Sequence, residues 1–514
     1  MKAIFRVDAS VAIGSGHLVR CLNLARALLE HGVDSHFVTK SHVGNLVALV
    51  RDSGFSVSEL ALEEPEIDHE SAYAAWVGGS WAADARETKR MIGADLVDWI
   101  IVDHYGLDWR WEKELRGSCK RLLVIDDLAN RIHDCDLLLD QNLIAGMDSR
   151  YNELIPHQCS TMLGPSYALL QPDYAALRKR TPPREGRIQR ILVYFGGADQ
   201  KNLTGTIINI LVSLNRDDII VDVVINTDSP FAAEIHASTE SKPNFVIHER
   251  KKSLAGLMVE ADLAIGAGGV TSWERCCLGL PTLLITLAEN QRPIATELDR
   301  LKLAIYAGDA EFYSAESLRC HIVSLLDQPL PSDWSERCSA VVDGSGAERV
   351  ASILAIGVET VLTPRFATIA DESLVLDWAN DPEARRNAFS TDKISPETHH
   401  QWYRAKLRDV ENCVLLIVEA DKFLPVGQIR FDRRQNGWEI SYMLDPCVRG
   451  RGIGTPLLFA AVQCFHRIHP DAAIFGRVKR GNLASCRVFE RLGFSCEERP
   501  EMLTYSLETK GTIQ

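Results

Sequence analysis

Two glycine-rich turns constrain the fold of this chain more than any other feature. The first, Gly14–His17, lies between the apolar run Ala3–Val7 and a segment with helical periodicity. The second, Gly266–Gly269, lies between the apolar run Leu263–Ile265 and another helical segment. A strand, a glycine turn and a helix in that order are typical of α/β folds, in which helices pack on a parallel sheet. We therefore expect an α/β protein with two such sheets.

The length of the chain and a change in its pattern predict three domains. The 514 residues correspond to about three domains at ~150 residues each. We expect Rossmann-like halves at residues 1–165 and 166–357. The stretch Lys179–Arg187, rich in proline, arginine and glycine, indicates a hinge or linker. After Leu362–Pro364 the apolar residues alternate as in an antiparallel sheet, which predicts an α+β domain at residues 362–514.

Charge and cysteine content exclude several classes of protein. The net charge of −14 gives no electrostatic support for a nucleic-acid partner. The 13 cysteines form no C-x-x-C pair, which argues against a disulfide framework and a structural zinc site. No signal-peptide pattern is present, and no apolar run approaches the ~18 residues of a membrane span. We expect a cytoplasmic protein without membrane or metal partners, and the sequence leaves its oligomeric state open.

The first glycine turn does not fit a nicotinamide cofactor. The dinucleotide fingerprint requires a third glycine where Val19 stands. The second strand ends in Lys40 and not in an acidic residue that would bind the ribose. We therefore expect no nicotinamide cofactor at this turn.

His17 is the candidate catalytic residue of the first turn. It stands where the predicted helix begins, at the carboxyl edge of the predicted sheet, where open α/β folds bind ligands. An imidazole there can take a proton from water near neutral pH. Asp103 and Tyr105 follow another apolar run and are expected at the same edge. The alternatives are that His17 only caps the helix and that Asp103 only caps a turn.

The second glycine turn is a candidate pyrophosphate site. Gly268 and Gly269 allow backbone amides to face an anion at the start of a helix, and Thr271 adds a hydroxyl donor. Glu274, one turn into the helix, is placed to accept hydrogen bonds from ribose hydroxyls. The alternative is a tight turn without a ligand. A second glycine turn in a second α/β half favours a clamp that holds a nucleotide between the halves.

Roughly the first 355 residues resemble the UDP-sugar hydrolases of pseudaminic acid biosynthesis. The motifs that carry the resemblance, in order, are Ile13–His17, Arg20–Ala25, Val102–Gly106, Leu163–Leu170, Phe195–Asp199, Gly268–Glu274, Glu289–Gln291 and Asp343–Ala347. His104 departs from the family, where a smaller residue is expected. The resemblance implies a glycosyltransferase-B fold and metal-independent release of UDP from UDP-2,4-diacetamido-2,4,6-trideoxy-β-L-altropyranose.

The resemblance also implies roles for individual residues. His17 would handle the proton of the attacking water. The residues expected to hold UDP or the sugar are Gly14, Gly16, Asp103, Tyr105, Gly196, Gly197, Gly268, Gly269, Thr271, Glu274, Asn290 and Gln291. One base would suffice, because UDP leaves readily once amides and hydroxyls hold its phosphates, and the anomeric centre would be inverted.

A third glycine motif lies in the last domain. The pattern Arg449-x-x-Gly452-x-Gly454 stands between an apolar strand and a helix, as a pyrophosphate cradle does. With Asn482–Phe494 downstream, it resembles the GCN5-related N-acetyltransferases and implies acetyl-CoA as co-substrate. The residues expected to bind acetyl-CoA are Leu444, Val448, Arg449, Gly450, Arg451, Gly452, Gly454, Asn482 and Ser485.

The source of acid and base in acetyl transfer is left open by the sequence. Many acetyltransferases have a tyrosine general acid where this chain has Phe489, and phenylalanine donates no proton. Glu439 and Tyr442, on the preceding strand, are candidates for base and acid. The alternative is that both are strand residues without a catalytic part.

The sequence predicts a bifunctional enzyme of nucleotide-sugar metabolism. The last domain would acetylate the 4-amino group of a UDP-amino-dideoxy-hexose, and the first two would hydrolyse the product to UDP and free sugar. One alternative is a sugar transferase of the same clamp fold fused to an acyltransferase of unrelated substrate. Another is a UDP-sugar binding module that has lost its chemistry.

Overall fold

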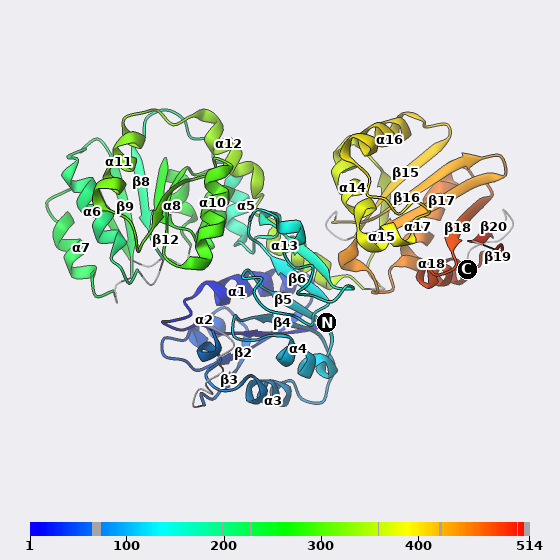
Figure 1. Ribbon diagram of the computed structural model, residues 1–514, viewed down its shortest axis with the longest axis horizontal. Coiled ribbons are helices and arrows are strands. Elements are labelled where there is room, and N and C mark those ends of the chain that lie inside the picture. Colours follow the sequence, from blue (N-terminus) through cyan, green and yellow to red (C-terminus); the bar gives the residue numbers. More distant parts are fainter. Residues whose placement is uncertain are drawn as a thin grey trace. The chain divides into compact units, whose positions relative to one another are not determined.

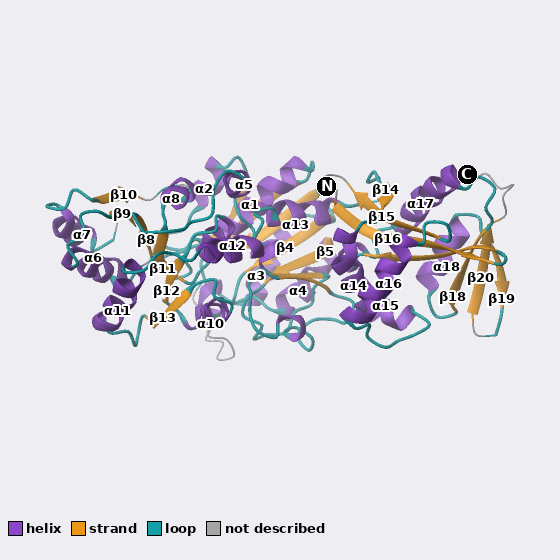
Figure 2. Ribbon diagram, turned by 90° about the horizontal axis from the view of Figure 1, so that it is seen from above, coloured by secondary structure: helices purple, strands orange, loops and turns teal. Residues whose placement is uncertain are grey.

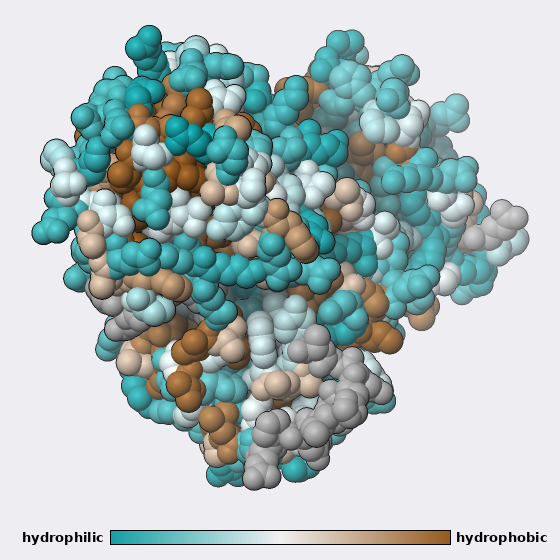
Figure 3. Space-filling view, turned by 60° about the vertical axis from the view of Figure 1, so that its left-hand side comes forward, coloured by the Kyte–Doolittle hydropathy of each residue, from teal (hydrophilic) through white to brown (hydrophobic). Residues whose placement is uncertain are grey.

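The computed structural model describes residues 1–63, 73–196, 199–226, 229–249, 251, 253–357, 359–420, 424–500 and 502–507. Contacts divide the chain into two compact units, Met1–Ala351 and Ser352–Gln514. In the described ranges, none of the helices is both long and apolar enough to cross a membrane. Hydrophilic residues cover most of the face shown in Figure 3, and the hydrophobic residues on it form separate patches.

The first sheet of the N-terminal unit is parallel, with strand order β3-β2-β1-β4-β5-β6-β7 (Figure 1). Its strands are β1 (Lys2–Val7), β2 (Asp34–Lys40), β3 (Ser56–Leu60), β4 (Val97–Asp103), β5 (Cys119–Ile125), β6 (Leu137–Asp140) and β7 (Ser160–Leu163). Its helices include α1 (Gly16–Glu30), α2 (Val47–Asp52), α3 (Trp81–Ile92) and α4 (Trp109–Leu115). β2 and β3 extend the sheet on one side of β1, and β4 to β7 extend it on the other, so the direction in which strands are added reverses between β1 and β4. Ligands bind at such a switch point in open α/β sheets.

The second sheet of this unit is also parallel and has the same kind of strand order, β10-β9-β8-β11-β12-β13. Its strands are β8 (Arg190–Tyr194), β9 (Ile220–Ile225), β10 (Phe245–Glu249), β11 (Leu263–Ala267), β12 (Thr282–Thr286) and β13 (Ile305–Asp309). The helices around it are α5 (Pro172–Arg178), α6 (Leu203–Ser213), α7 (Ala232–Thr239), α8 (Ala255–Glu260), α9 (Thr271–Cys277), α10 (Arg292–Arg300), α11 (Ala315–Leu326), α12 (Ser332–Val341) and α13 (Gly346–Ala355). The switch point here lies between β8 and β11.

Hydrogen bonds tie the two halves of this unit together. The indole Nε1 of Trp273, in α9, donates to the side-chain oxygen of Asn142, which follows β6, at 3.1 Å. The amide of Asn23, in α1, donates to the backbone carbonyl of Leu169 at 2.8 Å. Both contacts are buried, so the low dielectric strengthens them and makes a lost partner costly. They lie near the carboxyl ends of the strands that build the site.

The C-terminal unit contains a mixed sheet of order β14-β15-β16-β17-β18-β20-β19 (Figure 2). Its strands are β14 (Thr363–Phe366), β15 (Cys413–Ala420), β16 (Leu424–Arg434), β17 (Gly437–Leu444), β18 (Ile474–Lys479), β19 (Ser495–Glu498) and β20 (Met502–Leu507), and its helices α14 (Glu372–Asn380), α15 (Pro382–Asn387), α16 (Pro396–Arg408), α17 (Gly454–Ile468) and α18 (Leu483–Arg491). Within the described part of this sheet, only β17 and β18 pair in parallel. Separate apolar clusters join the sheet to α17 and α18 and to α14 and α16.

Candidate active sites

The first turn brings His17 onto a buried carboxylate. Gly14 adopts a φ of 81°, a conformation that favours glycine, and α1 begins two residues later. Asp103 is the last residue of β4, directly beside Val7 at the end of β1. The Nδ1 of His17 lies 2.6 Å from Oδ1 of Asp103, whose side chain is fully buried. This short contact with a carboxylate favours a proton on Nδ1.

Arg20 fixes the Asp103 carboxylate from the same helix face as His17. Its guanidinium donates to both oxygens of Asp103 at 2.6 Å and to Asp127 at 2.9 Å. Burial disfavours a charge on Asp103, but Arg20 and His17 outweigh it and hold the pKa of Asp103 well below its ordinary value. With Nδ1 on Asp103, Nε2 of His17 has no partner in the described parts of the chain and can accept a proton.

Aromatic rings form a wall beside His17. The ring of Tyr105 lies 4.5 Å from His17 in an edge-on arrangement and stacks on Trp76 at 5.4 Å. Tyr73 packs against both Tyr105 and Trp76. The hydroxyl of Tyr105 donates to Asp127, and only 6% of the residue is exposed. Burial and the charge of Asp127 raise the pKa of Tyr105, so its hydroxyl stays protonated.

One sequence-based expectation needs correction here. Asp103 was expected to contact UDP or the sugar, but it is completely buried and its oxygens are taken by His17 and Arg20. It positions the imidazole instead. Tyr105 was expected to bind the ligand as well, and this stays a prediction. Its hydroxyl donates to Asp127 and its ring packs against other aromatic rings beside His17.

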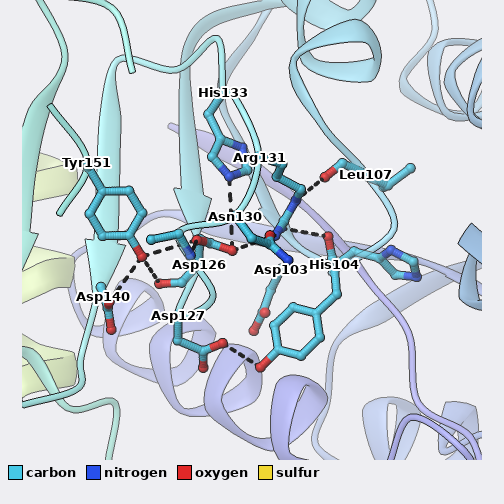
Figure 4. Close-up of polar contacts among 12 residues, drawn as sticks. Asp103, His104, Leu107, Asp126, Asp127, Asn130, Arg131, His133, Asp140 and Tyr151 are labelled. Atoms are coloured by element: carbon cyan, nitrogen blue, oxygen red, sulfur yellow. Dashed lines mark hydrogen bonds and ion pairs between the residues drawn. The ribbon is translucent and has the colours of Figure 1, made fainter. Parts of the chain in front are cut away.

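Two further strand-end carboxylates, Asp126 and Asp140, meet at the hydroxyl of Tyr151 (Figure 4). The hydroxyl of Tyr151 lies 3.1 Å from a carboxylate oxygen of Asp126 and 3.0 Å from one of Asp140. Burial, with the nearby charge of Asp127, raises the pKa of Asp140 to about 7. Arg131 pairs with Asp126 at 2.7 Å and also donates to backbone carbonyls of the loop after β4. These groups hold the loop ends that carry the first site.

The structure places His104 beside buried charged groups. This residue is 3% exposed, and its Nε2 lies 3.2 Å from a carboxylate oxygen of Asp8. Arg6 pairs with the same carboxylate and with Asp84, and all three are fully buried. Burial lowers the pKa of His104, which favours the neutral ring. The larger side chain therefore packs into a buried ionic cluster under the sheet edge.

The second glycine turn faces the first. A Cβ at Gly16 would lie 3.8 Å from the side chain of Val270, the residue just before α9. A Cβ at Gly268 would lie 3.2 Å from Leu284 and 3.5 Å from Gln291, so this position accepts a larger side chain only if its neighbours shift. Gln291 accepts a hydrogen bond from the backbone of Leu287, which holds its side chain beside the turn. The structure thus brings the predicted residues of both turns together.

Further predicted ligands cluster around this turn. Thr271 is the first residue of α9, and Asn290 is in the short 3₁₀ helix Glu289–Gln291. Gly196 follows β8, the neighbour of β11, whereas Gly197 lies outside the described residues. Burial raises the pKa of Glu274 to about 7, partly offset by a hydrogen bond with Tyr174. The residue as a whole is half-buried.

The third glycine motif forms a loop at the start of α17. Gly450 and Gly452 adopt φ values of 68° and 78°, which favour glycine, and the helix begins at Gly454. The side chain of Arg449 binds Asp381 at 2.5 Å, and that of Arg451 binds the carbonyl of Cys447 at 2.7 Å. The loop's backbone amides are therefore the groups suited to a pyrophosphate, since both arginine side chains are engaged with protein. Val448 is 1% exposed and packs into the core.

Of the remaining predicted residues of this unit, Tyr442 and Leu444 lie beyond the point where β17 and β18 stop pairing. The two strands pair only at residues 438–440 of β17, and half-buried Leu444 lies beyond the separation. Asn482 caps α18 by accepting from the backbone of Ser485. The hydroxyl of Tyr442 lies 2.9 Å from that of Ser485. Glu439, in contrast, is held by ion pairs with Arg434 and Arg477.

Sequence reasoning assigned no role to some residues that the structure places in these sites. Arg20 stands three residues after His17 on one helix face, and Asp127 follows β5; both positions were signals that could have been used. Trp76 gave no comparable signal, because it reaches His17 only through the fold.

These features define a glycosyltransferase-B-type unit of two Rossmann-like halves, followed by a GCN5-related N-acetyltransferase domain. The family model described as an acetyltransferase (GNAT) domain matches residues 362–495. The chain belongs to the family of the spore coat polysaccharide biosynthesis protein SpsG of Bacillus subtilis. It is 31% identical to that protein over 355 residues, which cover 68% of this chain and 96% of SpsG.

Two other relatives match different parts of the chain. The UDP-2,4-diacetamido-2,4,6-trideoxy-beta-L-altropyranose hydrolase of Campylobacter jejuni is 27% identical over 301 residues, which cover 58% of this chain and 96% of the hydrolase. An uncharacterized protein of Methanocaldococcus jannaschii, MJ1062, is 23% identical over 517 residues and covers 96% of both chains. The similarity to MJ1062 therefore extends through both units.

Proposed function

We propose that this protein acetylates a UDP-4-amino sugar and then hydrolyses the acetylated UDP-sugar. The N-terminal unit would release UDP from UDP-2,4-diacetamido-2,4,6-trideoxy-hexose. The C-terminal unit would transfer the acetyl group of acetyl-CoA to the 4-amino group that precedes it. The similarity to the Campylobacter jejuni hydrolase and the match to the acetyltransferase family support the two halves of this proposal.

The observation that carries the hydrolase assignment is the contact between His17 and Asp103. A carboxylate on Nδ1 selects the tautomer in which Nε2 accepts a proton. Nε2 would take a proton from water, whose oxygen attacks the anomeric carbon as the bond to UDP breaks. General base catalysis of this kind contributes about 10²–10⁴-fold to a rate.

The second glycine turn would stabilise the leaving UDP. Backbone amides at Gly268 and Gly269 and the hydroxyl of Thr271 lie at the start of α9, where a helix favours negative charge. Such groups act most strongly when they are fixed before the reaction and shielded from water. Attack by water on one face and departure of UDP from the other predict inversion at the anomeric carbon.

The acetyltransferase assignment depends on the loop Arg449–Gly454. Its amides would hold the pyrophosphate of acetyl-CoA, and the separation of β17 from β18 would receive the arm that carries the thioester. Strand backbone without a ladder partner can hydrogen-bond an extended amide chain. The amine nitrogen would attack the thioester carbonyl carbon, and coenzyme A would leave.

Product analysis tests the proposal. The protein is incubated with the diacetamido UDP-sugar, and UDP and sugar are followed by nuclear magnetic resonance and mass spectrometry. We expect equal amounts of UDP and free sugar, first released as the inverted anomer. Transfer of the sugar only to an added glycan or protein acceptor would show a transferase instead. Binding without turnover would show a binding module.

A further inference from the structure

Acetyl transfer requires a proton for the departing sulfur. Phe489 cannot donate one, and its packing leaves no room for a hydroxyl at the tip of its ring. Phe489 is 2% exposed and stacks on Tyr505 at 5.2 Å. A Cβ at Gly476 would lie only 2.5 Å from the ring tip of Phe489, so the ring closes directly over β18. A hydroxyl at that tip would meet the sheet. This position therefore serves packing, and the proton must come from elsewhere.

Tyr442 offers a hydroxyl at the point where β17 and β18 separate. The described pairing between these strands ends at Ile440 and Gly476, two residues before Tyr442. The hydroxyl of Tyr442 lies 2.9 Å from that of Ser485, in the first turn of α18. An extended arm that starts at the glycine loop and follows β17 reaches Leu444 first and Tyr442 next.

Glu439 does not compete for this role. Side chains alternate along a strand, so Glu439 and Tyr442 point to opposite faces of β17. Tyr442 packs against the cluster that contains α17 and α18. Both carboxylate oxygens of Glu439 are engaged in ion pairs, with Arg434 and with Arg477.

We propose that Tyr442 is the general acid of acetyl transfer and that Ser485 relays its proton. This inference rests on the proposed acetyltransferase function. The amine nitrogen forms a bond to the acetyl carbonyl carbon and the carbon–sulfur bond breaks. The hydroxyl of Tyr442 gives its proton to the sulfur. The proton lost by the amine nitrogen reaches solvent and returns to the Tyr442 oxygen through Ser485, so no proton is gained or lost overall.

The protonation state of Tyr442 suits a donor. Burial raises the pKa of Tyr442 to about 12, partly offset by the hydrogen bond with Ser485. The hydroxyl therefore remains protonated at neutral pH and is available before each turnover. The serine hydroxyl can accept and donate at once, as a relay requires.

Steady-state kinetics with acetyl-CoA and the UDP-4-amino sugar test the pair. Tyr442→Phe should lower kcat by ~10²-fold with KM for acetyl-CoA within about threefold, because only proton transfer is lost. Ser485→Ala should lower kcat by about tenfold, and the double variant should be no slower than Tyr442→Phe, because the effects of residues that act as a unit are not additive.

Tyr505→Phe, which removes another hydroxyl from the same core, is the matched control and should keep the wild-type kcat. Independent, multiplying losses would overturn the relay, and an unchanged kcat in Tyr442→Phe would overturn the acid.

A second measurement needs no amine acceptor. Coenzyme A is bound to the protein and its thiol is titrated by the ultraviolet absorbance of the thiolate. A tyrosine hydroxyl beside the sulfur stabilises the thiolate, so the thiol pKa should rise in Tyr442→Phe and stay unchanged in Tyr505→Phe. Equal thiol pKa values in wild type and Tyr442→Phe would overturn the proposal. If wild type fails to acetylate the amino sugar while this shift is seen, the acceptor assignment fails and the role of Tyr442 stands.

Discussion

The imidazole of His17 and the carboxylate of Asp103 lie 2.6 Å apart, although 86 positions separate them in the chain. The contact joins the first turn of α1 to the end of β4. Because Asp103 is fully buried and Arg20 fixes both of its oxygens, the carboxylate cannot turn away. The geometry therefore fixes the orientation of the His17 ring and favours the tautomer with the proton on Nδ1.

Loss of the imidazole should stop the hydrolase alone. His17→Ala should lower UDP release from the diacetamido UDP-sugar by ~10³-fold, because the proposed general base is lost. Release of coenzyme A from acetyl-CoA and the amino sugar should stay near the wild-type rate, because that chemistry belongs to the other unit. Both products are measured by chromatography. Retention of hydrolysis within tenfold would contradict the role of His17.

A neutral side chain of the same size at position 103 should show whether the carboxylate of Asp103 is needed to orient His17 or only to keep the protein folded. Asp103→Asn keeps the side-chain volume but removes the charge that selects the Nδ1 proton, so we expect UDP release to fall by about 10²–10⁴-fold. UDP affinity, measured by calorimetry, should change little, because the Asp103 carboxylate is buried and its oxygens are bound by His17 and Arg20. A large loss of UDP affinity with normal turnover at saturation would show that Asp103 binds the nucleotide after all.

Glu274 should make the stability of the protein depend on pH. Its pKa is about 7 in the folded protein and about 4.3 when unfolded, so the folded state binds its proton more tightly. The stability that this proton contributes is present at low pH and is lost as pH rises through 7. Glu274→Gln should unfold at a similar temperature near pH ~4 and at a higher temperature than wild type near pH ~8.

Glu274→Gln should at the same time bind UDP more weakly, because an amide oxygen accepts ribose hydrogen bonds less strongly than a carboxylate. Thermal unfolding and calorimetry at both pH values measure the two effects. A variant that gains no stability at the higher pH, or that binds UDP as tightly as wild type, would contradict the assignment of Glu274.

The acetyl-CoA loop should depend on glycine. Gly452 has a φ of 78°, and its backbone must lie close to a pyrophosphate. Gly452→Val should remove detectable acetyl-CoA binding in calorimetry, whereas hydrolysis of the pre-acetylated UDP-sugar should persist. The persistent hydrolysis serves as the folding control for the N-terminal unit. Unchanged acetyl-CoA affinity would place the cofactor elsewhere.

The two reactions should occur in a fixed order. A 4-amino group is a cation near neutral pH, whereas a 4-acetamido group is neutral and both donates and accepts. A hydrolase pocket built for the amide would leave polar groups unpaired against the amine and would have to desolvate a charge. Discrimination of up to ~10⁴-fold is expected from such a mismatch. The amino precursor alone should release little UDP until acetyl-CoA is added. Equal rates of release with and without acetyl-CoA would contradict this order.

The fold class was accessible from the sequence because its signals are local. Apolar runs followed by glycine turns mark strands that lead into helices, and the structure has β1 before α1 and β11 before α9 at those places. The positive φ values of Gly14, Gly450 and Gly452 match the need for glycine at three of the predicted positions. Such features depend on neighbours within a few residues, so periodicity and glycine placement suffice to find them.

The tertiary structure decided which side chains meet and what they are left free to do. The fold brings Asp103 into contact with His17 and brings Asp127 to Arg20, 107 positions away in the chain. It also brings the hydroxyl of Tyr442 to that of Ser485. Burial then turns an expected sugar ligand, Asp103, into a positioning group. By itself, the sequence determined the strand–turn–helix units and the kinds of residue at their ends. Their roles depended on long-range packing and desolvation, which no local pattern records.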